Sequence, residues 1–154
     1  YDDGPLGANA AYTKVDYASG AGATTSIRNF GIGGHYAFGS VLGNALLTTA
    51  ENAQTDAKVR QLRVGAKWDF SGPWSIAGSL AYAKGNAQLD NNHATQLTST
   101  LAYAFSKRTL AYVQGVHQKA NSGGQAHLMG VMDPAGASST SSQTVLRVGL
   151  HTSF

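Results

Sequence analysis

The segment Thr144-Val-Leu-Arg-Val-Gly-Leu-His-Thr-Ser-Phe154 is the stretch of sequence that decides the fold. Its apolar residues fall on one parity, namely Leu146, Val148, Leu150 and Phe154. Arg147 and His151 fall on the other parity. Because successive side chains of a β-strand point to opposite faces, this segment predicts a strand with one apolar face and one polar, cationic face. An aromatic residue closing such a strand on its apolar face is typical of transmembrane β-barrels, whose lipid-facing aromatics lie at the membrane boundary.

The composition fits a barrel with a lipid-facing outside and a polar inside. The 154 residues suffice for one domain, 12% of them are charged and 19 are glycine, whereas globular proteins carry roughly 25% charged residues. A soluble, turn-rich β-domain shares the glycine content but usually carries more charge. No stretch approaches the roughly 18 apolar residues of a transmembrane helix. The chain has no initiator methionine and no signal peptide, so we expect it to be processed or incomplete.

Eight segments are predicted to be antiparallel strands, at roughly 5–17, 25–38, 41–50, 59–70, 74–84, 95–105, 109–119 and 143–154. The connections between them alternate in length. The short ones are 39–40, 71–73 and 106–108, and the long ones are 18–24, 51–58, 85–94 and 120–142. Short turns on one side and longer loops on the other are typical of an all-β transmembrane barrel of the outer-membrane type, in which the short turns face the periplasm.

Parity divides most of these segments into a lipid-facing side and a water-facing side. The facing of the first, third and seventh segments stays open. The titratable residues predicted to line a pore are His35, Arg63, Lys67, Asp69, Arg147 and His151. Charged rings set the selectivity of channels, so the three cations would favour anions, with Asp69 offsetting part of their charge. The alternative interpretation is that they are solvated residues with a local effect only. Arg28 falls on the lipid parity, where it would snorkel to the head groups.

Aromatic residues on the apolar parity flank the short turns, which predicts an aromatic girdle at one membrane edge. The girdle residues are Tyr36, Phe38, Trp68, Phe70, Trp74, Tyr103, Phe105 and Phe154.

Enzyme and cofactor chemistry find no support in the sequence. Cysteine is absent, and no histidine pair has the compact spacing of a zinc motif, although His93 and His127 lie in or beside predicted loops. The glycines at 31–34 lack the helix that a dinucleotide site needs, and no nucleophile-elbow pattern surrounds a serine. We therefore predict no enzyme activity, no cofactor and no metal. The chain also lacks a basic run, which argues against a nucleic-acid partner.

Three stretches carry a resemblance to a known family: Tyr1-Asp-Asp-Gly-Pro-Leu-Gly-Ala-Asn-Ala-Ala-Tyr12, Phe105-Ser-Lys-Arg-Thr109 and Val145-Leu-Arg-Val-Gly-Leu-His-Thr-Ser-Phe154. They resemble the general porins of Gram-negative bacteria, of the Burkholderia and Neisseria type. The resemblance implies a trimer of sixteen-stranded barrels in the bacterial outer membrane, in contact with lipid or lipopolysaccharide. It implies passive diffusion of ions and small hydrophilic solutes through a water-filled channel. It also implies that the barrel-assembly machinery reads Leu146, Val148, Leu150 and Phe154.

The resemblance covers only the second half of such a porin. We expect residues 1–154 to be the C-terminal part of a single barrel domain, because the chain opens on a turn at 2–5 and lacks the constriction loop. The alternative is a complete, closed eight-stranded barrel with an adhesin or structural role, which would crowd charges into a narrow lumen. A soluble carbohydrate-binding sandwich is a third possibility.

Overall fold

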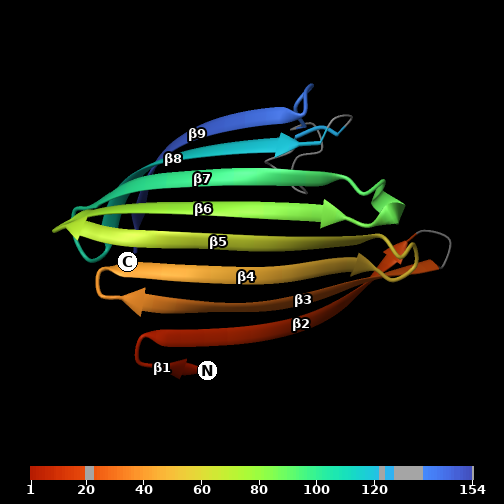
Figure 1. Ribbon diagram of the computed structural model, residues 1–154, viewed down its shortest axis with the longest axis horizontal. Helices are drawn as coiled ribbons and strands as arrows, with labels where there is room; N and C mark the ends of the chain where they lie inside the picture. The colour runs from red at the N-terminus through yellow and green to blue at the C-terminus, as the bar shows by residue number, and fades with distance from the viewer. Residues whose placement is uncertain (20–22, 122–123, 127–136, 154) are drawn as a thin grey trace.

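The molecule is a single antiparallel β-sheet in which each strand pairs with the next one along the chain (Figure 1). The computed structural model describes residues 1–19, 23–121, 124–126 and 137–153. The strands are β1 (Asp2–Asp3), β2 (Leu6–Ser19), β3 (Ala23–Phe38), β4 (Val41–Asn52), β5 (Lys58–Ser71), β6 (Trp74–Gly85), β7 (His93–Ala104), β8 (Thr109–Ala120) and β9 (Ser142–Thr152). One 3-10 turn, η1 (Ala87–Leu89), follows β6 and is the one helical element in these ranges. The predicted all-β antiparallel fold is confirmed.

The eight predicted segments correspond to β2–β9, and two details of the prediction are wrong. Residues 2–5 are not all turn, because β1 pairs with β2 and only Gly4 and Pro5 form the turn. The Tyr1 ammonium and carbonyl groups extend this ladder by bonding to Ala8 at 3.0 and 2.9 Å. A two-residue strand has no alternation that a sequence pattern could reveal. The connection predicted at 18–24 is also too long, because the ladder between β2 and β3 continues to the pair Ser19 and Ala23.

The connections at the two ends of the sheet differ in length. At one end, which we call the turn edge, the links are 4–5, 39–40, 72–73 and 105–108, and Gly39 and Gly72 adopt the positive φ values that tight turns require (+62° and +50°). At the other end, the loop edge, the links include 53–57, 86–92 and 121–141. In Figure 1 the turn edge lies on the left and the loop edge on the right.

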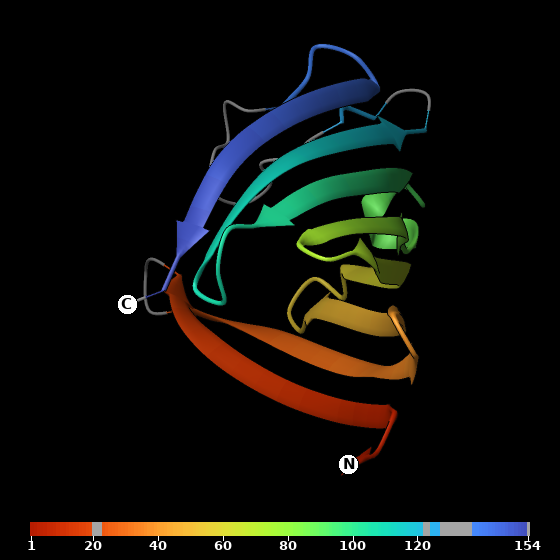
Figure 2. The same ribbon diagram turned by 90° about the vertical axis from the view of Figure 1, so that its left-hand side faces the viewer.

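The sheet curves into an open trough instead of packing around a core (Figure 2). Within the described residues, Ala126 is the only buried hydrophobic residue. Phe38, Phe70 and Phe105 are 65%, 42% and 64% exposed, so the compact apolar core of a soluble sandwich is absent from this part of the chain. No helix in the described part is long and apolar enough to cross a membrane. Strands β1 and β9 are the two ends of the described sheet and do not pair with each other.

Candidate functional site

The strand register sorts the side chains onto two faces. Directly paired residues share a face, and one such row runs across seven strands through Phe38, Val41, Trp68, Ile76, Leu101, Val113 and Val148. We call the face that carries this row the apolar face and the opposite one the polar face. The register also assigns the strands that the sequence left open, because the row includes Val41 and Val113 and because Leu6 pairs with Tyr36 on the same face.

The apolar face carries the predicted aromatic girdle at the turn edge. The rings contact one another in the pairs Tyr36–Phe38, Trp68–Phe70, Trp74–Tyr103 and Tyr103–Phe105, with centroids 4.4 to 5.4 Å apart. Phe154 lies outside the described residues. The predicted assembly residues Leu146, Val148 and Leu150 share the apolar face and are 73%, 77% and 68% exposed.

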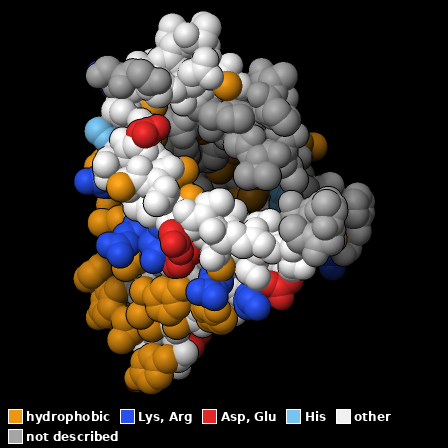
Figure 3. Space-filling view, turned by 90° about the vertical axis from the view of Figure 1, so that its right-hand side faces the viewer, with side chains coloured by type: hydrophobic (Ala, Val, Ile, Leu, Met, Phe, Trp, Pro, Cys, Tyr) orange, Lys and Arg blue, Asp and Glu red, His pale blue; other side chains and the backbone are white. Residues whose placement is uncertain are grey.

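A second set of aromatics on the apolar face lies toward the loop edge and was missed in the sequence. Tyr12 pairs directly with Phe30, and the Tyr82 ring contacts His93 with centroids 5.9 Å apart. Two aromatic bands that bracket an apolar belt are typical of a barrel that crosses a membrane. The sequence held a signal for this second band, since Tyr82 lies eight residues from Trp74 on the same parity of one strand. Figure 3 shows hydrophobic side chains gathered on one side of the loop edge, with Lys and Arg side chains between them and the loops.

The polar face holds all six titratable residues predicted from parity. Arg63, Lys67 and Asp69 project from β5, Arg147 and His151 from β9, and His35 from β3. Lys67 and Asp69 contact each other, and Arg63 lines one cavity together with Lys67. The other three residues lie on strands that do not pair with β5. The polar face is also less uniform than expected, because Leu42, Leu46, Leu110 and Val116 share it.

Hydrogen bonds and ion pairs orient the charged side chains of the polar face. The Lys67 ammonium lies 2.8 Å from a carboxylate oxygen of Asp69. The Arg63 guanidinium donates to the Ser79 hydroxyl at 3.2 Å, and that of Arg147 donates to the Tyr112 hydroxyl at 3.4 Å. Of the described residues, none places a carboxylate within 4.0 Å of either arginine. Asp69 is the one acidic side chain of the polar face in β2–β9. Its charge offsets that of Lys67, so no acid of these strands offsets the charge of either arginine.

Close packing against two glycines fixes two more side chains of the polar face. A Cβ atom on Gly7 would lie 2.2 Å from the His35 ring, and one on Gly149 would lie 2.5 Å from the Tyr112 ring. Each glycine thus leaves room for the ring of the residue paired with it on the neighbouring strand. The hydroxyl that meets Arg147 is held in place by this packing.

Two cavities demonstrate that the polar face is the concave one. A cavity of about 450 Å³ is lined by residues of four strands, β5–β8, including Lys67, Asp69 and Tyr112. A smaller one of about 130 Å³ lies beside Arg63. Only the concave side of a curved sheet brings side chains from four adjacent strands around one space.

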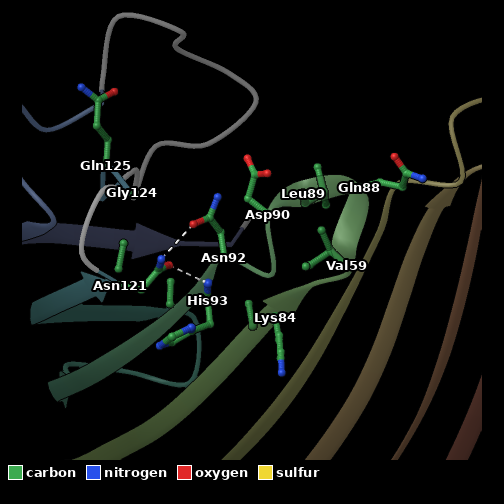
Figure 4. Close-up of a pocket in the computed structure, with 14 residues that line it drawn as sticks. Val59, Lys84, Gln88, Leu89, Asp90, Asn92, His93, Asn121, Gly124 and Gln125 are labelled. Carbon is green, nitrogen blue, oxygen red and sulfur yellow. Dashed lines mark hydrogen bonds between the residues drawn. The ribbon is translucent and has the colours of Figure 1, made fainter.

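A larger cavity of about 700 Å³ opens at the loop edge on the polar side (Figure 4). Its wall is amide-rich, since the Asn121 side chain donates to Asn92 Oδ1 and accepts from the His93 backbone N–H, both at 2.8 Å. Nowhere in the described ranges do three His, Cys, Asp or Glu side chains come together. His127, predicted near a loop, lies outside those ranges.

Comparison with known proteins identifies the family. A family model described as Gram-negative porin matches residues 1–123. No curated protein matches the chain. The match covers most of the sheet whose apolar face, aromatic bands and polar concave face are described above. The chain therefore belongs to the Gram-negative porins, channel-forming β-proteins of the bacterial outer membrane.

Proposed function

We propose that this sheet is part of the wall of a water-filled channel for passive diffusion of ions and small hydrophilic solutes, with a preference for anions. The observation that carries the proposal is the concave polar face, where the cavity beside Lys67 and Asp69 holds polar groups from four strands. Barrels of the porin type keep a polar, hydrated interior behind a lipid-facing belt. His35 and His151 belong to the same proposed wall.

The anion preference follows from the charge balance of that face. Asp69 is paired with Lys67 at 2.8 Å, whereas the partners that the described residues offer to the guanidinium groups of Arg63 and Arg147 are hydroxyl groups. An uncompensated cation in a channel attracts anions and repels cations, and low-dielectric walls strengthen the effect.

Planar-bilayer recording of the intact protein under a salt gradient tests this proposal. The double variant Arg63→Gln/Arg147→Gln should shift the reversal potential toward the cation side while single-channel steps persist. Lys107→Gln is the matched control, since Lys107 lies in the exposed 105–108 turn, and its reversal potential should stay at the wild-type value. An unchanged reversal potential in the double variant would show that the two arginines do not contribute to the ion selectivity of the pore.

We further propose that residues 1–154 contribute to one sixteen-stranded barrel domain of a homotrimer. Two observations support a larger barrel over a closed eight-stranded adhesin: nine strands lie in sequence order, and β1 and β9 do not pair with each other in the described sheet. Native mass spectrometry of the intact protein, with conductance measured on the same sample, distinguishes the two. A monomer of about 16 kDa without porin-sized steps would favour the small barrel.

The assembly proposal concerns β9. Leu146, Val148 and Leu150 form an exposed apolar row on the strand at the end of the described sheet, and with Phe154 they would be read by the barrel-assembly machinery. Replacing Phe154 by Ala should lower the amount of folded protein in the outer membrane. Normal levels in a quantitative immunoblot would argue against this role.

A further inference from the structure

Three neighbouring strands carry no charged side chain on the polar face. All residues of β6, β7 and β8 are described, and their polar-face positions hold Ala, Gly, Ser, Thr, Gln, Leu, Val and Tyr. The strands on either side differ, since β5 carries Arg63, Lys67 and Asp69 on that face and β9 carries Arg147 and His151. A solute that follows β6–β8 therefore meets hydroxyl, amide and small apolar groups instead of ions.

Two rows of like residues cross this uncharged part of the face near the loop edge. The alanine row, aligned by the register, consists of Ala83, Ala94 and Ala120. The glutamine row, two residues closer to the turn edge, consists of Gln96, Gln118 and Gln143. The Gln118 amide donates to the Gln96 side-chain oxygen at 3.3 Å, and the Gln96 amide donates to the Thr98 hydroxyl at 3.4 Å. A row of methyl groups thus borders a row of ordered, uncharged amides.

The cavity of about 700 Å³ at the loop edge lies over the alanine row, because all three alanines line it. Its volume falls within the range of about 300–1,000 Å³ that is usual for small-molecule sites. Leu89 of η1 forms an apolar part of the wall. A Cβ atom on Gly85 would lie 2.7 Å from the Leu89 Cβ, so the glycine lets η1 pack against the end of β6. The floor and this wall are therefore apolar and close-packed.

The polar part of the wall is held by hydrogen bonds before any solute arrives. Asn92 Oδ1 accepts from the Asn121 side chain at 2.8 Å, and the Asn92 Nδ2 atom points away from Asn121 (Figure 4). Lys84 and His93 also contribute to the lining, but the register places their side chains on the apolar face. Asp90 is the one acidic residue among those that line the cavity.

This set of groups suits a solute that is neutral and rich in hydroxyl groups. A hydroxyl group both donates and accepts hydrogen bonds, and a side-chain amide offers both functions. The Asp90 carboxylate accepts from hydroxyl groups and repels anions. A metal ion is disfavoured, since no group of three His, Cys, Asp or Glu side chains exists in the described ranges. The alanine row leaves room for the face of a ring, and a few placed polar groups around an apolar surface are typical of small-molecule sites.

We infer that this cavity binds a neutral saccharide at the mouth of the channel. The inference deepens the proposed function and rests on it, because the site lies on the wall of the proposed channel. A saccharide that leaves the alanine row toward the turn edge meets the glutamine row next. Binding at the mouth makes the effect of the saccharide on the channel saturable, whereas the effect of a solute that only diffuses through rises in proportion to its concentration.

Single-channel recording of the intact protein, with the glucose trisaccharide maltotriose as probe, tests the inference. Polyethylene glycol of the same mass is the comparison solute, because it has hydroxyl groups only at its two ends. Maltotriose should interrupt the ion current in a saturable manner, and the glycol should lower the current in proportion to its concentration. The variant Ala94→Trp fills the middle of the alanine row and should weaken the effect of maltotriose roughly tenfold or more.

The variant Ala11→Trp is the matched control. Ala11 lies on β2 in the same directly paired row of the polar face, and β3, β4 and β5 separate it from Ala83. It introduces the same side chain but leaves the cavity open, so maltotriose should act on it as on the wild type. Asn92→Leu is a second variant, in the 86–92 connection. It should raise the half-saturating concentration of maltotriose roughly three- to tenfold, because it removes one amide from the wall.

The outcomes distinguish this inference from the proposed function. Absence of conductance steps in the wild type would refute both, whereas steps without a saturable effect of maltotriose would refute the saccharide site alone. Equal saturation by the glycol would exclude recognition of hydroxyl groups, and equal losses in Ala94→Trp and Ala11→Trp would assign the effect to narrowing of the channel. Conductance steps in potassium chloride verify that each variant is folded. If Ala94→Trp gives none, Asn92→Leu decides, and a wild-type response to maltotriose in that variant would overturn the inference.

Discussion

Introducing a charge at the middle of the apolar belt gives a direct measure of which face meets lipid. On β7, Tyr103 and Thr95 are eight residues apart and pair with Trp74 and Tyr82 of the two aromatic bands. At about 3.3 Å per residue the segment is about 26 Å long, and a strand tilt of about 40° reduces this to about 20 Å across the membrane. Ser99 is four residues from each end and therefore lies about 10 Å from either band.

The variant Ser99→Arg isolates the cost of the charge. Ser99 pairs with Gly78 and Gly115 on the apolar face, so a long side chain meets no neighbouring side chain in either paired position. At this depth we expect a destabilisation of about 2–4 kcal/mol, because Arg at the midplane of a barrel's lipid face costs that much. Thr98→Arg, one residue along on the polar face, should change the free energy of unfolding by less than about 1 kcal/mol, since its charge would stay in water.

Urea-induced unfolding in lipid vesicles, followed by tryptophan fluorescence, measures both variants. The expected difference corresponds to roughly a 30- to 1000-fold change in the unfolding equilibrium constant. If Thr98→Arg were as destabilising as Ser99→Arg, or if Ser99→Arg matched the wild type, the assignment of the apolar face to lipid would be refuted.

Two further predictions concern the polar face. Gly149→Val should destabilise the protein by about 1–3 kcal/mol because its side chain would displace the Tyr112 ring. The comparison variant Gly115→Val lies on the apolar face of the neighbouring strand β8, where a Cβ meets nothing within 4 Å, and should be neutral or stabilising in the same unfolding assay. Asp69→Asn should release Lys67 from its ion pair and shift the reversal potential toward anions, opposite in sign to the arginine double variant. Stability should change by under about 1 kcal/mol, because both partners are about half exposed; a shift toward cations would contradict the charge balance proposed here.

The sequence by itself determined the fold class, the strand positions and the facing of the regularly alternating strands. In β5, Leu62, Val64 and Trp68 alternate with Arg63 and Lys67. Because successive side chains of a strand point to opposite faces, this period of two predicts a strand with one apolar and one polar face. The turn-edge aromatics were equally readable, because each lies beside a short connection. The sequence did not show which face of strands β2, β4 and β8 is apolar. In β4, Leu46 and Leu47 are adjacent and therefore point to opposite faces, and in β2 small residues occupy both faces.

The features that depend on pairing between strands were decided only by the tertiary structure. The two-residue strand β1 exists through its ladder with β2 and has no pattern of its own. Arg60, Lys84 and His93 are separated in the sequence by loops and turns, and the register alone places them in one row. Local periodicity reports the direction of each side chain relative to its own strand. The neighbours of that side chain depend on hydrogen-bond register between strands, which is a property of the whole sheet.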